Sequence, residues 1–284
     1  MTSLVSVRDL CWKYVGAQQL ALDHINFDLM PGEVLGVTGP SGAGKTTLCM
    51  SINGLIPNNF HGDYSGEVLI KDKRTEDCAV CDLVQEVGLV FQDPESQFMG
   101  MSVEEELVFT LENLGLTDED IYDRINRAIR MVHMEDYLDR SPFSLSGGQK
   151  QKVAIASCLA LNPSVLVLDE PTSELDPIGT TEVFAVLQEL KMSKEMGIIL
   201  ISHATEDLAK FCDRVLLLSE GNQIDLLSAQ EFFASVDLMS QYGVQIPQIV
   251  KAFDMAGCLS KQKMPITLEQ ASNMFLEVSH GRFG

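Results

Sequence analysis

The chain is poor in basic residues and has no long apolar run. Its 284 residues include 20 Lys and Arg against 41 Asp and Glu, which gives a formal net charge of -21. A surface this acidic repels phosphate backbones and anionic lipids, so binding to nucleic acid and direct adhesion to a membrane are disfavoured. The apolar runs fall short of the roughly 18 residues that a membrane-spanning helix needs. We therefore expect any membrane contact to go through a protein partner.

Signals for secretion and for disulfides are also missing. The N-terminal segment MTSLVSVRDL lacks a basic region followed by an apolar one, so we expect no secretory signal and a cytosolic protein. The seven cysteines are odd in number and lie in apolar segments, which favours reduced, mostly buried thiols. Cys78 and Cys81 have the spacing of a metal or redox pair, but no second pair accompanies them. We interpret them as small apolar residues, with a metal or redox role as the weaker alternative.

Short apolar runs alternate with segments of helical periodicity along most of the chain. Such runs, buried on both faces, predict an α/β fold with a mainly parallel core sheet. Residues 1–227 form the main domain in this interpretation, with a helical subdomain at about 92–162, and residues 228–284 form a C-terminal helical domain. Strands are predicted at 4–14, 25–29, 33–39, 66–70, 86–92, 164–169, 197–202 and 214–219, and helices at 44–53, 101–115, 118–133, 150–161, 229–236, 247–257 and 267–278.

The segment GPSGAGKT fits the phosphate-loop pattern G-x-x-x-x-G-K-[ST] and lies between a predicted strand and a predicted helix. Glycines let backbone amides curl around a phosphate, and the helix N-terminus adds unpaired N–H donors. Lys45 would place a cation on the phosphates, and the Thr46 hydroxyl could bind Mg²⁺. The predicted nucleotide-binding residues here are Gly39, Pro40, Ser41, Gly42, Ala43, Gly44, Lys45, Thr46 and Thr47.

Two acids end the apolar run SVLVLDEP. Asp169 could hold Mg²⁺ directly or through water, and Glu170 could orient and deprotonate a water molecule. The alternative is that both acids only terminate a strand. Their position downstream of a phosphate loop favours a phosphoryl-transfer site.

The stretch SLSGGQKQKVAIASCLALNPSVLVLDEPTSELDP resembles the signature-to-D-loop region of ABC-transporter ATPases. With the phosphate loop, the resemblance covers roughly residues 4 to 225. It implies a P-loop NTPase fold with an antiparallel β subdomain, ATP and Mg²⁺ as ligands, and a second ATPase subunit as partner, in either a homodimer or a heterodimer. In this family two subunits sandwich two ATP molecules between the phosphate loop of one and the signature motif of the other.

The resemblance also assigns roles to particular residues. Tyr14 matches the aromatic residue that stacks on adenine, with Trp12 as a fallback because Val15 replaces a commoner proline. Gln92 matches the glutamine that touches Mg²⁺ and senses the transporter partner. The residues that would complete the ATP site of the opposite subunit are Ser146, Gly147, Gly148 and Gln149.

Four more positions follow from the same resemblance. His203 matches the switch histidine that contacts the γ-phosphate, so it joins Glu170 and Gln92 as a catalytic candidate. Asp176 matches the D-loop aspartate of the dimer interface, next to Glu174 where a small residue is usual. Lys152 stands where arginine is common, which would weaken a structural ion pair because the fork geometry is lost.

The stretch from Val87 to Leu116 resembles the energy-coupling-factor (ECF) group of these ATPases, with a short helix at 93–98, and the tail from Tyr242 to Ala271 resembles their C-terminal domain. The resemblance implies an importer of a vitamin or a transition-metal ion, in which a transmembrane coupling subunit docks near Gln92 and a separate membrane subunit binds the substrate. The tail would help two ATPase subunits associate, or would only cover this chain's own core. The expected location is peripheral, on the cytoplasmic face of the cell membrane.

Three other functions are the alternatives to an ECF importer. They are the ATPase of a conventional ABC importer or exporter, a soluble ABC protein acting on DNA or ribosomes, and a nucleotide sensor without hydrolysis.

Overall fold

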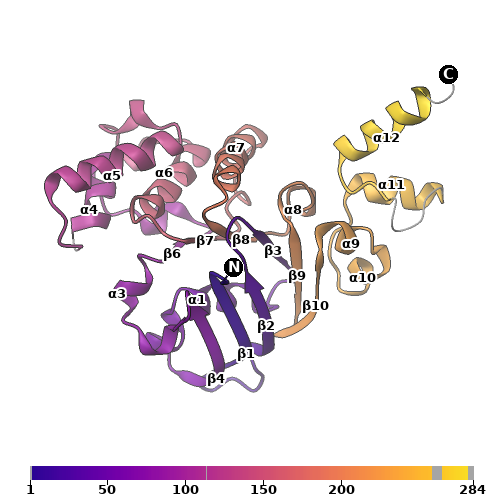
Figure 1. The fold of residues 1–284 in the computed structure, drawn as a ribbon, viewed down its shortest axis with the longest axis horizontal. Helices are drawn as coiled ribbons and strands as arrows, with labels where there is room; N and C mark the ends of the chain where they lie inside the picture. The colour runs from indigo at the N-terminus through magenta and orange to yellow at the C-terminus, as the bar shows by residue number, and fades with distance from the viewer. Residues whose placement is uncertain (1, 113, 258–263, 281–284) are drawn as a thin grey trace.

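The computed structural model describes residues 2–112, 114–257 and 264–280. Asn113 and residues 258–263, which belong to the two stretches that resemble ECF ATPases, lie outside the described residues, as do residues 281–284 of the predicted C-terminal domain. A sheet of ten strands runs through the molecule in the order β5-β4-β1-β2-β10-β9-β3-β8-β7-β6. Figure 1 shows helices packed around this sheet and the C-terminal helices extending to one side.

Five parallel strands form the centre of the fold. They are β6 (Val87–Val90), β7 (Val165–Asp169), β8 (Gly197–Ile201), β3 (Val34–Thr38) and β9 (Arg214–Ser219). Alternate residues of β7 go to two separate hydrophobic clusters, Leu166 and Leu168 to one and Val165 and Val167 to the other. The sheet is therefore buried on both faces, and the predicted mainly parallel core is confirmed.

The other strands form the antiparallel part of the sheet. They are β1 (Val5–Tyr14), β2 (Leu22–Leu29), β4 (Gly62–Ile70) and β5 (Lys73–Arg74). β10 (Asn222–Ser228) is antiparallel to β9 and joins the two parts of the sheet through the pairing of Asn222 with Asp23 of β2. The sequence did not predict β10, because most of its residues are only partly buried and the apolar signal is weak.

Three helices form most of the block between β6 and β7. They are α4 (Val103–Glu112), α5 (Asp118–Met131) and α6 (Gly147–Ala160). α5 buries Ile121, Ile125 and Ile129 on one side, which is the helical spacing seen in the sequence. The sequence predicted a loop up to Gln149, and this was wrong. Ser146 and Gln149 form a capping box, which satisfies free backbone donors and starts α6 at Gly147.

The remaining helices connect the strands or follow the sheet. The connecting helices are α1 (Lys45–Ile52), α2 (Leu55–Asn58), α3 (Val80–Leu83), α7 (Pro177–Ser193) and α8 (Thr205–Phe211), with 3₁₀ turns η1 (Thr75–Asp77), η2 (Pro94–Gln97), η3 (Glu135–Tyr137) and η4 (Pro142–Ser144). After β10 come α9 (Ala229–Phe233), α10 (Val236–Gln241), α11 (Gln248–Ala256) and α12 (Leu268–His280). None of the helices in the described ranges has the length and apolarity needed to cross a bilayer.

The C-terminal helices have two kinds of apolar surface. Met239, Val250 and Ile266 are buried and belong to the same hydrophobic cluster as one face of the core sheet. This part of the tail covers the chain's own core, as one of the two alternatives expects. Met255 and Leu268 are instead largely exposed, on α11 and α12, which project from the body in Figure 1.

Candidate active site

The phosphate loop connects β3 to α1, and two of its glycines pack closely against the backbone of neighbouring segments. Gly39 has a φ of 145°, and a Cβ atom there would lie 2.0 Å from the carbonyl oxygen of Leu218. Gly44 has a φ of 102°, and a Cβ there would lie 2.4 Å from the carbonyl oxygen of Ala21. Both positions therefore require glycine, for conformation and for space. The loop backbone is fixed against β9 and the segment that leads into β2.

Lys45 lies across the mouth of this loop. Its side-chain Nζ donates to the carbonyl oxygens of Gly39 at 3.0 Å and Pro40 at 3.1 Å, and it lies 3.2 Å from Nε2 of His203. Burial lowers the pKa of Lys45, while the nearby Glu170 and Asp169 oppose that shift. Phosphate oxygens could replace the two carbonyl acceptors, because they offer the ammonium a stronger, charged hydrogen-bond partner.

Thr46 and Asp169 bring two oxygen ligands together. The Thr46 hydroxyl donates to Oδ2 of Asp169 at 2.8 Å, which joins the start of α1 to the end of β7. Burial raises the pKa of Asp169, and the hydrogen bond from Thr46 opposes this. A hydroxyl and a carboxylate are oxygen donors of the kind that Mg²⁺ prefers, so these residues fit that ion. Gln92 follows β6, the strand beside β7, and within the described ranges its exposed side chain has no hydrogen bond to either residue.

Glu170 and His203 lie together at the ends of β7 and β8. Oε2 of Glu170 accepts from the backbone N–H of His203 at 3.3 Å, and Oε1 lies 3.4 Å from Nε2 of the same histidine. The second contact does not have the geometry of a hydrogen bond, and among the described residues this buried Oε1 has no hydrogen-bond partner. Burial raises the pKa of Glu170, against the opposing effect of His203. A buried carboxylate oxygen without a partner can accept a proton from a water molecule.

Tyr14, at the end of β1, lies beside the helix that follows the phosphate loop. Its hydroxyl is 3.2 Å from Oγ1 of Thr47, and its ring meets Trp12 edge to face with centroids 5.6 Å apart. Trp12 is fully buried, so the fallback in which it stacks on a nucleotide is wrong. Tyr14 is half-buried and stays the candidate, while Val15 is 78% exposed.

The signature residues lie on a second surface. Ser146 is the N-cap of α6 and forms two hydrogen bonds with Gln149. Its side chain accepts from the backbone N–H of Gln149, and its own backbone N–H donates to Oε1 of Gln149 at 3.0 Å. Ser146, Gly147 and Gly148 line one hollow together with the start of α7, where Asp176 is the N-cap and accepts from Gly179 N at 2.7 Å. In the part of the chain that is described, no hydrogen bond joins these residues to the phosphate loop of the same chain. The exposed N-terminus of α6 is therefore free to receive a ligand from elsewhere.

Two ion pairs around α6 could not be read from the sequence, because each joins residues far apart in the chain. Nζ of Lys150 lies 2.5 Å from Oε1 of Glu95, which ties the η2 turn after Gln92 to the first turn of α6. Lys152 reaches Oε2 of Glu182 on α7 at 3.4 Å. The lysine thus still makes an ion pair at the position where arginine was expected.

The cysteine pair remains without support as a metal site. Cys81 is exposed and Cys78 half-buried, and neither belongs to a group of three potential ligands among the described residues. Cys11, Cys49 and Cys212 are buried as expected.

Comparisons with known proteins show what this chain is similar to. The sequence model of the ABC transporter family matches residues 22–173. The chain is 34% identical over 287 residues to the energy-coupling factor transporter ATP-binding protein EcfA2 of Clostridium acetobutylicum, covering 96% of this chain and 97% of that protein. Two Pyrococcus relatives at 40% identity are named only as ABC transporter ATP-binding proteins.

Two solved structures share the fold. The structure of cbiO1 from Clostridium perfringens, part of the ABC transporter complex cbiONQ, has a TM-score of 0.76 at 31% identity and covers 89% of this chain and 100% of that one. A dimeric post-hydrolysis ATP-binding cassette bound to ADP and Pi has a TM-score of 0.68 at 26% identity and covers 79% of this chain and 98% of that one. The chain therefore belongs to the ABC transporter family, as an ATP-hydrolysing, ATP-binding subunit that resembles the energy-coupling-factor type.

Proposed function

We propose that this chain is the ATP-hydrolysing subunit of an ECF-type importer and powers uptake of a vitamin or a transition-metal ion through a transmembrane coupling subunit. The observation that carries this proposal is the similarity to EcfA2 along nearly the full length of both chains. The similarity to cbiO1, which is part of the ABC transporter complex cbiONQ, supports it independently through the fold.

In the proposed reaction, Lys45 and the amides of the phosphate loop bind the phosphates of ATP. Thr46, Asp169 and Gln92 would hold Mg²⁺, which supplies charge neutralisation at the phosphate oxygens. Glu170 takes a proton from a water molecule, and the oxygen of that water forms a bond to the γ-phosphorus while the bond from phosphorus to the ADP oxygen breaks. His203, between Lys45 and Glu170, contacts the γ-phosphate and positions Glu170 through its backbone N–H.

The site is completed by a second ATPase subunit in this proposal. Ser146, Gly147, Gly148 and Gln149 of one subunit cap the ATP that lies on the phosphate loop of the other. Ser146 and Gly147 are exposed, and together with Gly148 they line one hollow with Asp176, which supports this arrangement. The dimeric state of the cassette bound to ADP and Pi supports it as well. Tyr14 would stack on the adenine, and the exposed apolar residues of α11 and α12 would add to the contact between subunits.

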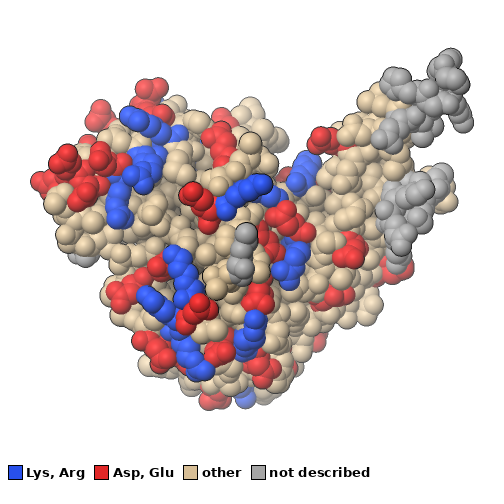
Figure 2. All heavy atoms as spheres, in the orientation of Figure 1, with Lys and Arg blue, Asp and Glu red and all other residues tan. Residues whose placement is uncertain are grey.

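The coupling subunit would dock at Gln92 and the following segment 93–98. Asp93 caps the η2 turn, and the pair of Glu95 with Lys150 links this segment to the helix that begins in the signature motif. A movement at the docking surface would thereby reach the cap of the partner's ATP. The chain would sit peripherally at the cytoplasmic face of the membrane. On the face shown in Figure 2, basic side chains are interspersed with acidic ones, which suits a protein partner better than nucleic acid.

Purification of the native complex tests this proposal. We expect the chain to co-purify with a transmembrane coupling subunit and a separate substrate-binding membrane protein, with ATPase activity in the complex. Co-purification with a conventional pair of transmembrane domains, or ATPase activity stimulated by DNA or ribosomes without any membrane subunit, would contradict the ECF assignment.

A further inference from the structure

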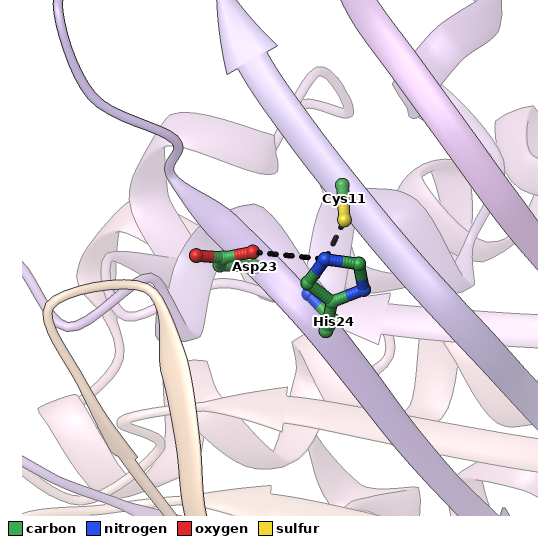
Figure 3. Close-up of side chains that lie close together, drawn as sticks. All are labelled: Cys11, Asp23 and His24. Carbon is green, nitrogen blue, oxygen red and sulfur yellow. Dashed lines mark hydrogen bonds and ion pairs between the residues drawn. The ribbon is translucent and has the colours of Figure 1, made fainter.

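A second group of potential ligands lies away from the ATP site, on the antiparallel part of the sheet. Cys11 of β1 and Asp23 and His24 of β2 each offer one ligand atom, and these atoms all lie within 4.8 Å of one another. Figure 3 shows the three side chains close together across the two strands. Neither the sequence patterns nor the ATPase reaction accounts for this cluster.

An irregular pairing of β1 with β2 brings these residues together. The register shifts between Val7 and Leu10 and again between Leu10 and Trp12. Asp9 of β1 and His24 of β2 lie within these two register shifts, and their φ angles of 51° and 53° are in the left-handed region. The β2 strand is fixed from its other side as well, since the backbone N–H of Asp23 donates to the carbonyl oxygen of Gly221 at 2.8 Å. The ligand residues therefore sit on two strands held at both edges.

The surrounding hydrogen bonds orient the ligands. Nδ1 of His24 is bonded to Oδ1 of Asp9 at 2.5 Å, which leaves Nε2 as the ring nitrogen available for a metal. A carboxylate on the far nitrogen of a histidine is the usual support for a metal-bound imidazole. The backbone N–H of His24 donates to Sγ of Cys11 at 3.2 Å, which holds the sulfur atom beside β2.

We propose that Cys11, Asp23 and His24 bind one divalent transition-metal ion of the zinc type. Sulfur, imidazole nitrogen and carboxylate oxygen are the ligands that Zn²⁺ takes, and three protein ligands leave one position for water. Nε2 of His24 lies 3.6 Å from Oδ1 of Asp23, and two light-atom ligands of a tetrahedral zinc lie roughly 3.4 Å apart. Cys11 is buried while Asp23 and His24 are partly exposed, so the ion can enter from solvent and the two outer side chains can close on it.

This site differs in chemistry from the Mg²⁺ site. Thr46, Asp169 and Gln92 offer only oxygen, which suits a hard ion, whereas a thiolate and an imidazole select a softer one. The two sites should therefore fill independently, and nucleotide-free protein without Mg²⁺ should still bind the softer ion.

Cobalt titration tests the proposal, because a thiolate bound to Co²⁺ gives a charge-transfer absorption band and intense tetrahedral bands in the visible. Reduced, nucleotide-free full-length chain at mildly alkaline pH is titrated with Co²⁺ and then with Zn²⁺. We expect one equivalent of Co²⁺ to bind with the thiolate band, and Zn²⁺ to displace it. Cys11→Ser should abolish the band, and Asp9→Asn should weaken binding about 10- to 100-fold, as loss of a supporting carboxylate does.

Two further variants keep the test decisive. His24→Asn is at an exposed position and asparagine tolerates the left-handed conformation, so this variant should fold and lose tight binding. The matched control is Cys78→Ser with Cys81→Ser, which removes the other candidate pair and should keep the band. No Co²⁺ binding by the wild-type chain, or a band that survives in His24→Asn and disappears in the Cys78/Cys81 control, would overturn the proposal.

Discussion

Replacing Glu170 with glutamine separates the chemical step from folding and binding. The side chain is only 13% exposed, and the amide is the same size as the carboxyl. In the wild-type chain the backbone N–H of His203 donates to Oε2 of Glu170 at 3.3 Å. The amide oxygen of glutamine can accept the same hydrogen bond, so the local geometry should persist. What is lost is the negative charge that takes the proton from water. A positioned general base contributes about 10²- to 10⁴-fold to a rate, or roughly 3–5 kcal/mol of barrier.

The stability of this variant should move in the opposite direction to its activity. Burial raises the pKa of Glu170, which means that the folded protein holds the charged form at a cost. A neutral amide removes that cost, and the unfolding temperature should stay the same or rise. Nucleotide affinity should also be kept, because Lys45 and the loop amides bind the phosphates.

The assay is phosphate release at saturating ATP, with nucleotide binding and thermal unfolding measured on the same preparation. Glu195→Gln, at an exposed position outside the site, is the matched control and should retain full turnover. Turnover of Glu170→Gln within a few-fold of wild type would remove Glu170 as the base. A loss of turnover with an equal loss of nucleotide binding would show that the side chain acts in binding instead.

Three other predictions concern pH, packing and coupling. Burial raises the pKa of Glu170, so its base form is lost at a higher pH than in an exposed glutamate. The acid limb of the kcat/KM profile should therefore have an apparent pKa above the ordinary glutamate value of 4.5. An apparent pKa at or below that value would contradict the role of a buried Glu170 as the base. Gly148→Ala would place a Cβ 2.8 Å from the Cα of Gly179, where α6 meets α7. This crowding should lower the free energy of unfolding, measured by urea titration, by about 1–3 kcal/mol. An unchanged urea midpoint would show that the two helices can move apart at no cost in stability. Glu95→Lys should change the free energy of unfolding by less than about 1 kcal/mol, because the ion pair with Lys150 is partly exposed. It should still reduce the transport per ATP hydrolysed in reconstituted vesicles, and the double variant Glu95→Lys, Lys150→Glu should recover it. Equal transport by the wild type, the single variant and the double variant would exclude a coupling role for this ion pair.

The sequence predicted the part of the fold that repeated local patterns encode. The runs that became β7, β8 and β9 are apolar throughout because parallel core strands are buried on both faces. The phosphate loop was readable because Gly39 and Gly44 are required by the backbone itself. Within the site, the structure places Lys45 and His203 within 3.2 Å of each other, although they are 158 residues apart in sequence.

The rest depends on contacts that no local pattern carries. β10 is half-buried and has a mixed composition, so its pairing with β9 left no periodic signal. The start of α6 was missed because glycines disfavour helix while the capping box favours it. The cluster of Cys11, Asp23 and His24 exists only because a shifted register puts β1 against β2 in one particular way.

Complementation between two defective chains tests most directly whether each ATP site is shared by two subunits. Lys45→Ala removes the phosphate-loop cation and Ser146→Arg blocks the signature surface, so each variant alone should be inactive in the assay in which the wild-type chain hydrolyses ATP. Mixed at equal amounts, half of the dimers should contain both variants, and each of these has one site with intact Lys45 and intact Ser146. Activity should then return to about a quarter of the wild-type rate. A mixture no more active than its components would contradict a shared site, as would a Ser146→Arg chain that keeps full activity alone.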